Sequence, residues 1–161
     1  MRKLSMEELG RKSVADFKLA AKKPIVLVLD NIRSMHNVGS VFRTSDAFLI
    51  SGICLCGFTP QPPHRDIHKT ALGATDSVDW MYYEQTIDAV IALKNQGYKV
   101  YALSNAPKPH LEIYMKNHSF FNLFDGITAS YEVGSRKPEP EPYLALLKKF
   151  SIAPANLFFI D

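Results

Sequence analysis

Cysteine is scarce in this sequence, which holds only Cys54 and Cys56 among its 161 residues. One Cys-Leu-Cys step has neither the spacing nor the number of ligands of a zinc site, and it does not make a disulfide framework. Both cysteines stand in an apolar run, and residues two apart in a strand share one face. We therefore expect reduced cysteines that pack in a core.

Long apolar runs are also missing. No stretch approaches the roughly 20 apolar residues of a membrane span. The N-terminus carries charges within its first apolar turns, where a signal peptide would have an apolar core. These absences predict a cytoplasmic protein.

Net charge is low, but the cations are unevenly placed. The formal charge is +3, and residues 1–23 hold seven Lys or Arg residues against three acidic residues. This segment can meet a polyanion, or it can be the solvated face of an amphipathic helix. The charge pattern leaves both interpretations open.

The sequence does contain an alternation of short apolar runs and segments whose apolar residues have helical spacing. Continuous β-branched runs predict buried parallel strands, and apolar residues three and four apart predict helices. The alternation favours an α/β protein, a single Rossmann-like, three-layer domain with a mainly parallel sheet and helices on both faces. The predicted strands are 25–30, 53–58, 77–81, 99–103, 124–129 and 157–160. The predicted helices are 13–22, 38–49, 64–72, 85–96, 107–117 and 140–150, with Asn37 as an N-cap.

Two arginines, Arg33 and Arg43, flank the predicted helix start after the first strand. Backbone N–H groups and the helix dipole favour an anion there, and guanidinium groups add bidentate phosphate contacts. Ligands of open α/β sheets bind at this strand end. The segment predicts an RNA or phosphate site at Arg33 and Arg43, although a plain N-cap at Asn37 and a surface role for Arg43 explain the pattern equally well.

The same segment resembles the first motif of the SpoU-type RNA 2′-O-methyltransferases, of the knotted SPOUT class of S-adenosylmethionine enzymes. The match reads Asn-Ile-Arg-Ser-x-x-Asn-Val-Gly-Ser-x-Phe-Arg-Thr from Asn31, and the likeness continues to about Tyr101. The resemblance implies that Asn37 and Arg43 lie at the methyl-transfer site, where the arginine helps to activate a ribose hydroxyl. The later motifs, which form the knot around S-adenosylmethionine, do not follow Tyr101, so we expect an incomplete cofactor site.

From Leu103 onward the sequence resembles the haloacid-dehalogenase superfamily of phosphohydrolases. Leu-Ser-Asn at 103–105, Arg-Lys-Pro-Glu-Pro at 136–140 and a last apolar run ending in an acid follow the order of its later motifs. The resemblance implies catalytic remnants at Ser104, Lys137 and Asp161. The first motif, an Asp-x-Asp that supplies nucleophile and proton donor, does not occur, and the acidic set for Mg2+ is incomplete. We therefore expect neither turnover nor a magnesium site.

These two resemblances predict a chimera of a methyltransferase-like half at 1–101 and a hydrolase-like half at 102–161, joined between Trp80 and Ala102. We expect an engineered or recombinant protein without native turnover. An RNA-binding SpoU-type methyltransferase and a weak phosphatase are the alternatives. The last predicted strand ends the chain where a natural domain would continue with a covering helix, which predicts truncation or deliberate construction.

The predicted ligands and partners follow from these sites. RNA binding should be weak, indifferent to base sequence and dependent on salt, because the predicted contacts reach phosphates. We expect no cofactor and no metal; His64 and His68 have the spacing of a metal pair but lack a third ligand. The halves should share one sheet centred on 25–30 and 99–103, and displaced edge strands should favour a homodimer.

Overall fold

The computed structural model describes residues 12–154. The chain divides into two compact units, Met1–Ala89 and Val90–Asp161. The division falls within the interval 80–102 in which the junction is predicted, and the helix α5 (Thr86–Asn95) runs across it. Among the described residues, every helix is too short or too polar to span a membrane.

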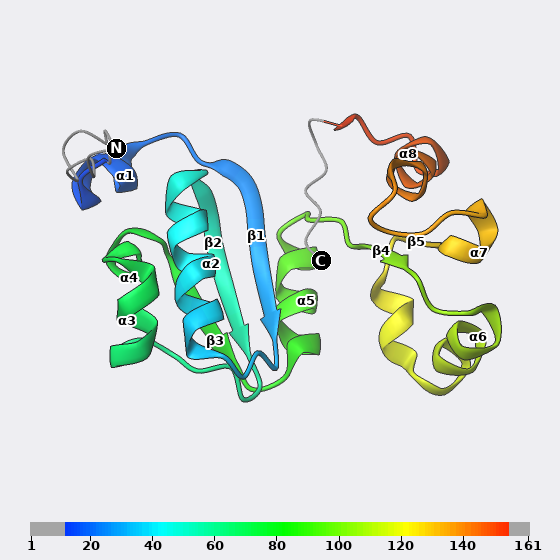
Figure 1. The fold of residues 1–161 in the computed structure, drawn as a ribbon, viewed down its shortest axis with the longest axis horizontal. Coiled ribbons are helices and arrows are strands. Elements are labelled where there is room, and N and C mark those ends of the chain that lie inside the picture. Colours follow the sequence, from blue (N-terminus) through cyan, green and yellow to red (C-terminus); the bar gives the residue numbers. More distant parts are fainter. Residues whose placement is uncertain (1–11, 155–161) are drawn as a thin grey trace, which may run out of the picture. The chain divides into compact units, whose positions relative to one another are not determined.

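The first unit contains a parallel three-stranded sheet with the order β1-β2-β3 (Figure 1). Its central strand β2 is the most deeply buried, because it has a neighbour on each side and an apolar sequence that suits burial on both faces. The α/β class and the parallel pairing are thus confirmed. The strands are β1 (Lys23–Asp30), β2 (Ile50–Cys56) and β3 (Trp80–Tyr83).

Four of the helices that the structure describes belong wholly to the first unit. α2 packs against β2 and against α3 and α4, and its buried side chains Val38 and Phe42 enter the core. The helices are α1 (Val14–Leu19), α2 (Met35–Ala47), α3 (Arg65–Ala71) and α4 (Ala74–Ser77). The buried core of the unit consists of Phe17, Leu27, Leu29, Val38, Phe42, Ile50, Ile53, Leu55, Ile67, Ala71, Ala74 and Val78.

The predicted N-cap at Asn37 is wrong. α2 begins at Met35, three residues before the predicted start, and its N-cap is Ser34, whose Oγ accepts from the N–H of Asn37 at 3.2 Å. Serine and asparagine are both good N-caps, and the use of Ser34 adds almost a turn to the helix. At α1 the N-cap is Ser13, whose Oγ accepts from the N–H of Asp16 at 3.1 Å.

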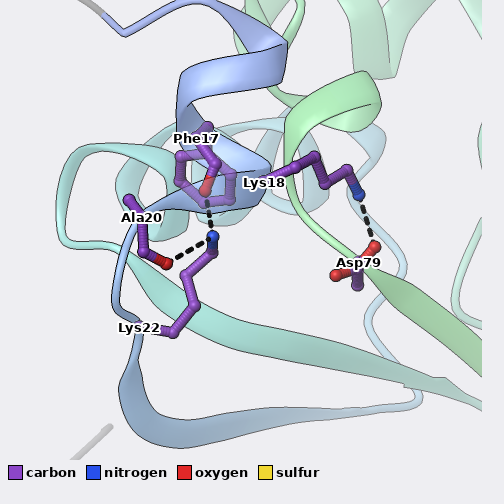
Figure 2. Close-up of polar contacts among 5 residues, drawn as sticks. All are labelled: Phe17, Lys18, Ala20, Lys22 and Asp79. Atoms are coloured by element: carbon purple, nitrogen blue, oxygen red, sulfur yellow. Dashed lines mark hydrogen bonds and ion pairs between the residues drawn. The ribbon is translucent and has the colours of Figure 1, made fainter.

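Two lysines contact α1 or lie in it: Lys18 joins α1 to the residue before β3, and Lys22 folds back onto the end of α1 (Figure 2). Lys18 pairs with Asp79, and the Nζ of Lys22 donates to the carbonyl of Phe17 and, at 3.4 Å, to that of Ala20. The same Nζ lies 4.1 Å from the centroid of the Phe17 ring. Two cations of the basic segment at 1–23 therefore serve the packing of α1, and residues 1–11 lie outside the described part.

Gly39 sets the close approach of α2 to α3. A Cβ at this position would lie 2.1 Å from Thr70 Oγ1 and 2.3 Å from the carbonyl oxygen of Ile67. Thr70 Oγ1 uses the short separation to donate to the carbonyl of His36 at 2.9 Å. Glycine is therefore required at position 39, because α2 and α3 leave no room for a side chain between them.

The second unit has a two-stranded parallel sheet of β4 and β5. Phe150 closes over it: the ring occupies the space that a side chain at Gly126 would need, and it lies 5.0 Å from the ring of Tyr101. The elements are β4 (Tyr101–Ser104), α6 (Lys108–Asn117), the 3-10 helix η1 (Ser119–Leu123), β5 (Gly126–Ala129), α7 (Ser130–Val133) and α8 (Pro140–Lys149).

The prediction of one sheet shared by both halves is wrong, because the described strands form two sheets. Each sheet pairs strands that are consecutive along the chain and joined by helical crossovers, the usual arrangement of neighbours. β4 has four residues, none of them buried, and so offers little apolar surface to a longer sheet that buries its centre. The predicted strand at 157–160 lies outside the described residues.

Candidate nucleic-acid interface

The loop after β1 begins with Asn31, which adopts a left-handed backbone conformation with φ of 54°. Its N–H donates to the carbonyl of Cys56 at 3.2 Å, so the β1–β2 pairing extends one residue beyond β1. Its Oδ1 accepts from the N–H of Phe58 at 3.2 Å, and its Nδ2 donates to Asp30 at 2.7 Å. Asparagine is among the residues that tolerate this conformation, because its short amide bonds locally. Asn31 thus ties together the loops that follow β1 and β2.

Thr59 makes a second tie between these loops. Its buried hydroxyl donates to the carbonyl of Leu29 and accepts from the N–H of Ile32, each at 3.0 Å. A buried hydroxyl that both donates and accepts is satisfied and fixes the backbone that it joins. The positions of residues 31 and 32 are therefore set before the chain reaches Arg33.

Arg33 is exposed at the carboxyl end of β1, directly before the N-cap of α2. Its guanidinium carbon lies 5.5 Å from the centroid of the Phe58 ring, within the range of a cation–π contact. The nearby carboxylate of Asp30 accepts hydrogen bonds from Asn31 and Thr86, so it is engaged with its neighbours. This loop presents a guanidinium and a helix N-terminus together, which suits a phosphate.

Asn37 and Arg43 are both exposed on α2. They are six positions apart, which on a regular helix separates them by about 9 Å along the axis and about 120° around it. Asn37 lies in the first turn with Arg33 just before it, whereas Arg43 lies well along the helix. The described geometry thus groups Asn37 with Arg33 and leaves Arg43 on another face of α2.

His64 and His68, which have the spacing of a metal pair, belong to α3 and its cap. His64 is the N-cap, and its Nδ1 accepts from the N–H of Asp66 at 3.2 Å. The ammonium of Lys69, 2.6 Å from Asp66, lowers the pKa of that carboxyl. Within residues 12–154 no group of three or more His, Cys, Asp or Glu side chains is arranged to hold a metal ion.

The cysteines of β2 are free and buried. Burial raises the pKa of Cys54 to about 11, and the neighbouring Cys56 adds to the shift. Burial also raises the pKa of Cys56. Both groups therefore remain protonated thiols at neutral pH and act as small packing residues, since the thiolate is the reactive form.

In the second unit the structure brings two of the predicted hydrolase-like residues close together. Ser104 ends β4, and the next residue, Asn105, is paired with the backbone of Lys137: its Oδ1 accepts from the Lys137 N–H at 3.0 Å and its Nδ2 donates to the Lys137 carbonyl at 3.2 Å. This two-point contact fixes the loop that carries Lys137 at the carboxyl end of β4. Asp161 lies outside the described residues.

Sequence reasoning missed Asn31, Thr59 and Phe58 as parts of the first site. Asn31 was visible only as part of the motif, and its left-handed backbone had no separate signal. Thr59 follows β2 by three residues in a proline-rich loop, where no periodicity points to a role. Phe58 reads as the last apolar residue of a predicted strand, but β2 ends at Cys56 and leaves the ring exposed.

Known proteins resemble this chain over parts of its length. The sesquiterpene phosphatase astK of Aspergillus oryzae is 41% identical over 69 residues, which are 43% of this chain and 35% of that protein. The 23S rRNA (guanosine-2′-O-)-methyltransferase RlmB of Vibrio parahaemolyticus is 25% identical over 91 residues, 56% of this chain and 37% of that protein. The chain spans about a third of the length of these curated relatives.

A solved structure, an AdoMet-bound rRNA methyltransferase from Sinorhizobium meliloti, matches 52% of this chain and 31% of its own, with 23% identity and a TM-score of 0.45. The model of the SpoU rRNA Methylase family matches residues 24–123. This match contains the segment from Asn31 to Thr44, and it runs past Tyr101, the point at which the sequence predicted the likeness to end. Because it covers more than half of the sequence, the chain belongs to the SpoU rRNA Methylase family.

Proposed function

We propose that the chain acts as an RNA-binding part of a SpoU-type RNA 2′-O-methyltransferase, with Arg33 and the start of α2 as the phosphate contact. The observation that supports this most directly is the loop after β1, which hydrogen bonds hold to the loop after β2. It carries an exposed guanidinium beside a helix N-terminus. The family membership adds weight, since RNA is the substrate that it implies. By the family resemblance Asn37 and Arg43 then belong to the methyl-transfer site.

S-adenosylmethionine is not expected to bind to this chain alone. In open α/β sheets a nucleotide-like ligand binds at the point where the strand order reverses, between two diverging strands. The order β1-β2-β3 has no reversal among the described strands, and β4 pairs with β5 instead of β1. This strand order supports the proposal that the chain alone does not hold the cofactor. Isothermal titration calorimetry should show no binding, and a micromolar affinity would overturn this point.

RNA binding is testable by fluorescence anisotropy of a labelled RNA at two salt concentrations. We expect wild-type affinity to fall steeply with salt, and Arg33→Ala to weaken binding and reduce the slope of log K against log salt by about 0.7 to 0.9. Lys116→Ala, which removes an exposed cation from α6, is the matched control and should leave both quantities unchanged. Binding that ignores both salt and Arg33 would contradict the proposal.

A second candidate function rests on the contact between Asn105 and Lys137. It holds the backbone of Lys137 close to Ser104, which ends β4. A hydroxyl and an ammonium at one strand end would suit a phosphoryl oxygen, and a phosphatase is among the relatives. The proposal is a hydrolase-like remnant that binds phosphate weakly without turnover, because the Asp-x-Asp nucleophile does not occur in the sequence. On this reading the origin as an engineered or recombinant chimera stays a prediction.

A magnesium-dependent phosphate-release assay tests this candidate. We expect no release above background from wild type. Weak phosphate binding, followed by chemical-shift changes at Ser104, should disappear in Lys137→Ala and persist in Lys148→Ala. Turnover that Lys137→Ala abolishes would make the chain a phosphatase and correct the proposal.

A further inference from the structure

Phe58 is an aromatic residue exposed directly after the most buried strand of the first unit. Its side chain is 57% exposed, whereas Leu55 and Cys56 just before it are fully buried. A single exposed apolar residue is common on protein surfaces and by itself indicates nothing. The exposed Phe48 also has a cation beside it, since Lys23 Nζ lies 5.4 Å from its ring centroid, but Phe48 caps the end of α2. Phe58 differs from it because it lies beside Arg33 at the carboxyl end of β2 on a fixed backbone.

The backbone at Phe58 is held by hydrogen bonds to both strands that flank β2, to the residue after β1 and to β3. Its own N–H donates to Asn31 Oδ1 at 3.2 Å. The preceding Gly57 has φ of 61°, its N–H donates to the carbonyl of Tyr83 at 3.1 Å, and its carbonyl accepts from the hydroxyl of Tyr82 at 2.9 Å. A ring mounted on a fixed backbone is presented to a ligand with little entropy left to lose.

Arg33 and Phe58 also form one chemical unit. The guanidinium carbon lies 5.5 Å from the ring centroid, and Asn31 and Thr59 cross-link the loops that carry the two side chains. Proteins that bind single-stranded nucleic acid combine a cation for the phosphate with an aromatic face for the adjacent base. Here both components stand at the carboxyl end of neighbouring parallel strands, where ligands of such sheets bind.

We propose that Phe58 is a stacking platform for an unpaired nucleobase of single-stranded RNA whose adjacent phosphate is held by Arg33. This inference rests on the RNA binding proposed above and adds the class of RNA. An unpaired segment is required, because bases within an A-form duplex stack on each other and leave no free face to a side chain.

The test compares ring and cation in the full chain, with anisotropy of labelled short oligoadenylate. Phe58→Ala and Phe58→Leu should each weaken binding about tenfold, while Phe58→Trp retains it, because stacking needs an aromatic face. The salt dependence should stay as in wild type in all three variants, since no cation is removed. An abasic oligomer of the same length should bind wild type and Phe58→Ala equally. Circular dichroism verifies that each variant is folded, and Trp80 fluorescence does so for the variants without an added tryptophan.

The outcomes separate the two proposals. Equal oligoadenylate affinity of wild type, Phe58→Ala and Phe58→Leu, with a weaker Arg33→Ala variant, overturns the stacking platform and leaves RNA binding intact. The stacking platform is also overturned if Phe58→Leu weakens binding of the abasic oligomer as much as it weakens binding of the base-containing oligomer. If neither Arg33→Ala nor Phe58→Ala changes binding, both proposals fall.

Discussion

The two units cover parallel strands with helices in the same way but are stabilised differently. The first unit has twelve buried residues in one apolar cluster around a central strand. In the second unit β4 is only half-buried, and a two-stranded sheet is marginal on its own. Polar ties supplement the packing there, such as Asp125, whose Oδ2 accepts from Lys94 Nζ and from the N–H of Val100, each at 2.8 Å. Apolar burial thus dominates in one unit, and specific hydrogen bonds matter more in the other.

The largest expected effect is loss of the core of the first unit. Phe42→Ala removes a fully buried ring and should lower the free energy of unfolding by about 4 kcal/mol. Trp80 lies in β3, so its fluorescence during urea unfolding reports on this unit. Reaction of the buried thiols Cys54 and Cys56 with a thiol reagent should accelerate in parallel, because opening exposes them.

The matched variant in the second unit is Leu146→Ala, which truncates an equally buried side chain of α8. It should leave the Trp80 transition and thiol reactivity unchanged and speed amide exchange in β4 and β5. If Leu146→Ala lowered the urea midpoint of the Trp80 transition as much as Phe42→Ala does, the two units would unfold together. The two units would then not differ in how they are stabilised.

A side chain placed between α2 and α3 should lower the free energy of unfolding by less than Phe42→Ala does. Gly39→Ala places a Cβ 2.3 Å from the backbone oxygen of Ile67, so α2 and α3 must separate, at a cost of about 2 kcal/mol. Gly52→Ala is the control, because its Cβ meets no atom closer than the carbonyl oxygen of Asp79 at 3.3 Å. In thermal unfolding followed by Trp80 fluorescence, Gly39→Ala should have a lower melting temperature than Gly52→Ala. Equal melting temperatures would show that α2 and α3 can separate without loss of stability.

The smallest expected effect belongs to the polar tie of the second unit. The hydrogen bond from Lys94 and that from the backbone of Val100 lower the pKa of Asp125. Asp125→Asn should cost about 1 kcal/mol at neutral pH. Because the folded-state pKa lies below the unfolded value, this contribution is present above about pH 4 and is lost as pH falls through the folded pKa.

Amide exchange in β4 and β5, compared between wild type and Asp125→Asn over this pH range, measures the effect. Glu112→Gln is the control, since Glu112 forms only an exposed pair with Lys108 on α6. A difference between wild type and Asp125→Asn that persists unchanged at pH 2 would show that the carboxylate charge is not the cause.

Periodicity was sufficient to find the strands and helices that bury a continuous apolar face. The run from Ile25 to Asp30 and the spacing of Val38 and Phe42 each had one physical interpretation, and the structure agrees with it. The pairing of strands was harder, since β4 is an apolar run that could join either sheet. Which sheet β4 joins depends on how much apolar surface a strand of four residues can bury. The order of its apolar and polar residues does not give that area.

The parts of the candidate site that depend on the type of side chain could be predicted from the sequence. The parts that depend on backbone conformation and on hydrogen bonds between loops could not. Arg33 and Asn37 stand out as polar residues after an apolar strand, and both lie at the expected strand end. The N-cap was misassigned, because Ser34 and Asn37 are chemically equivalent candidates. The roles of Asn31 and Thr59 depend on hydrogen bonds between loops about 27 residues apart, which no local pattern encodes.

The consecutive pairing of strands has a consequence for synthesis on the ribosome. The three described strands of the first sheet have been made once Tyr83 has been added, and within residues 12–154 none of them pairs with a later strand. Domains fold as units from the N-terminus during synthesis, and pairings between near neighbours form early. The first unit can therefore complete its sheet while the second is still being translated, and nascent chains arrested shortly after Asn95 has left the exit tunnel should already resist protease.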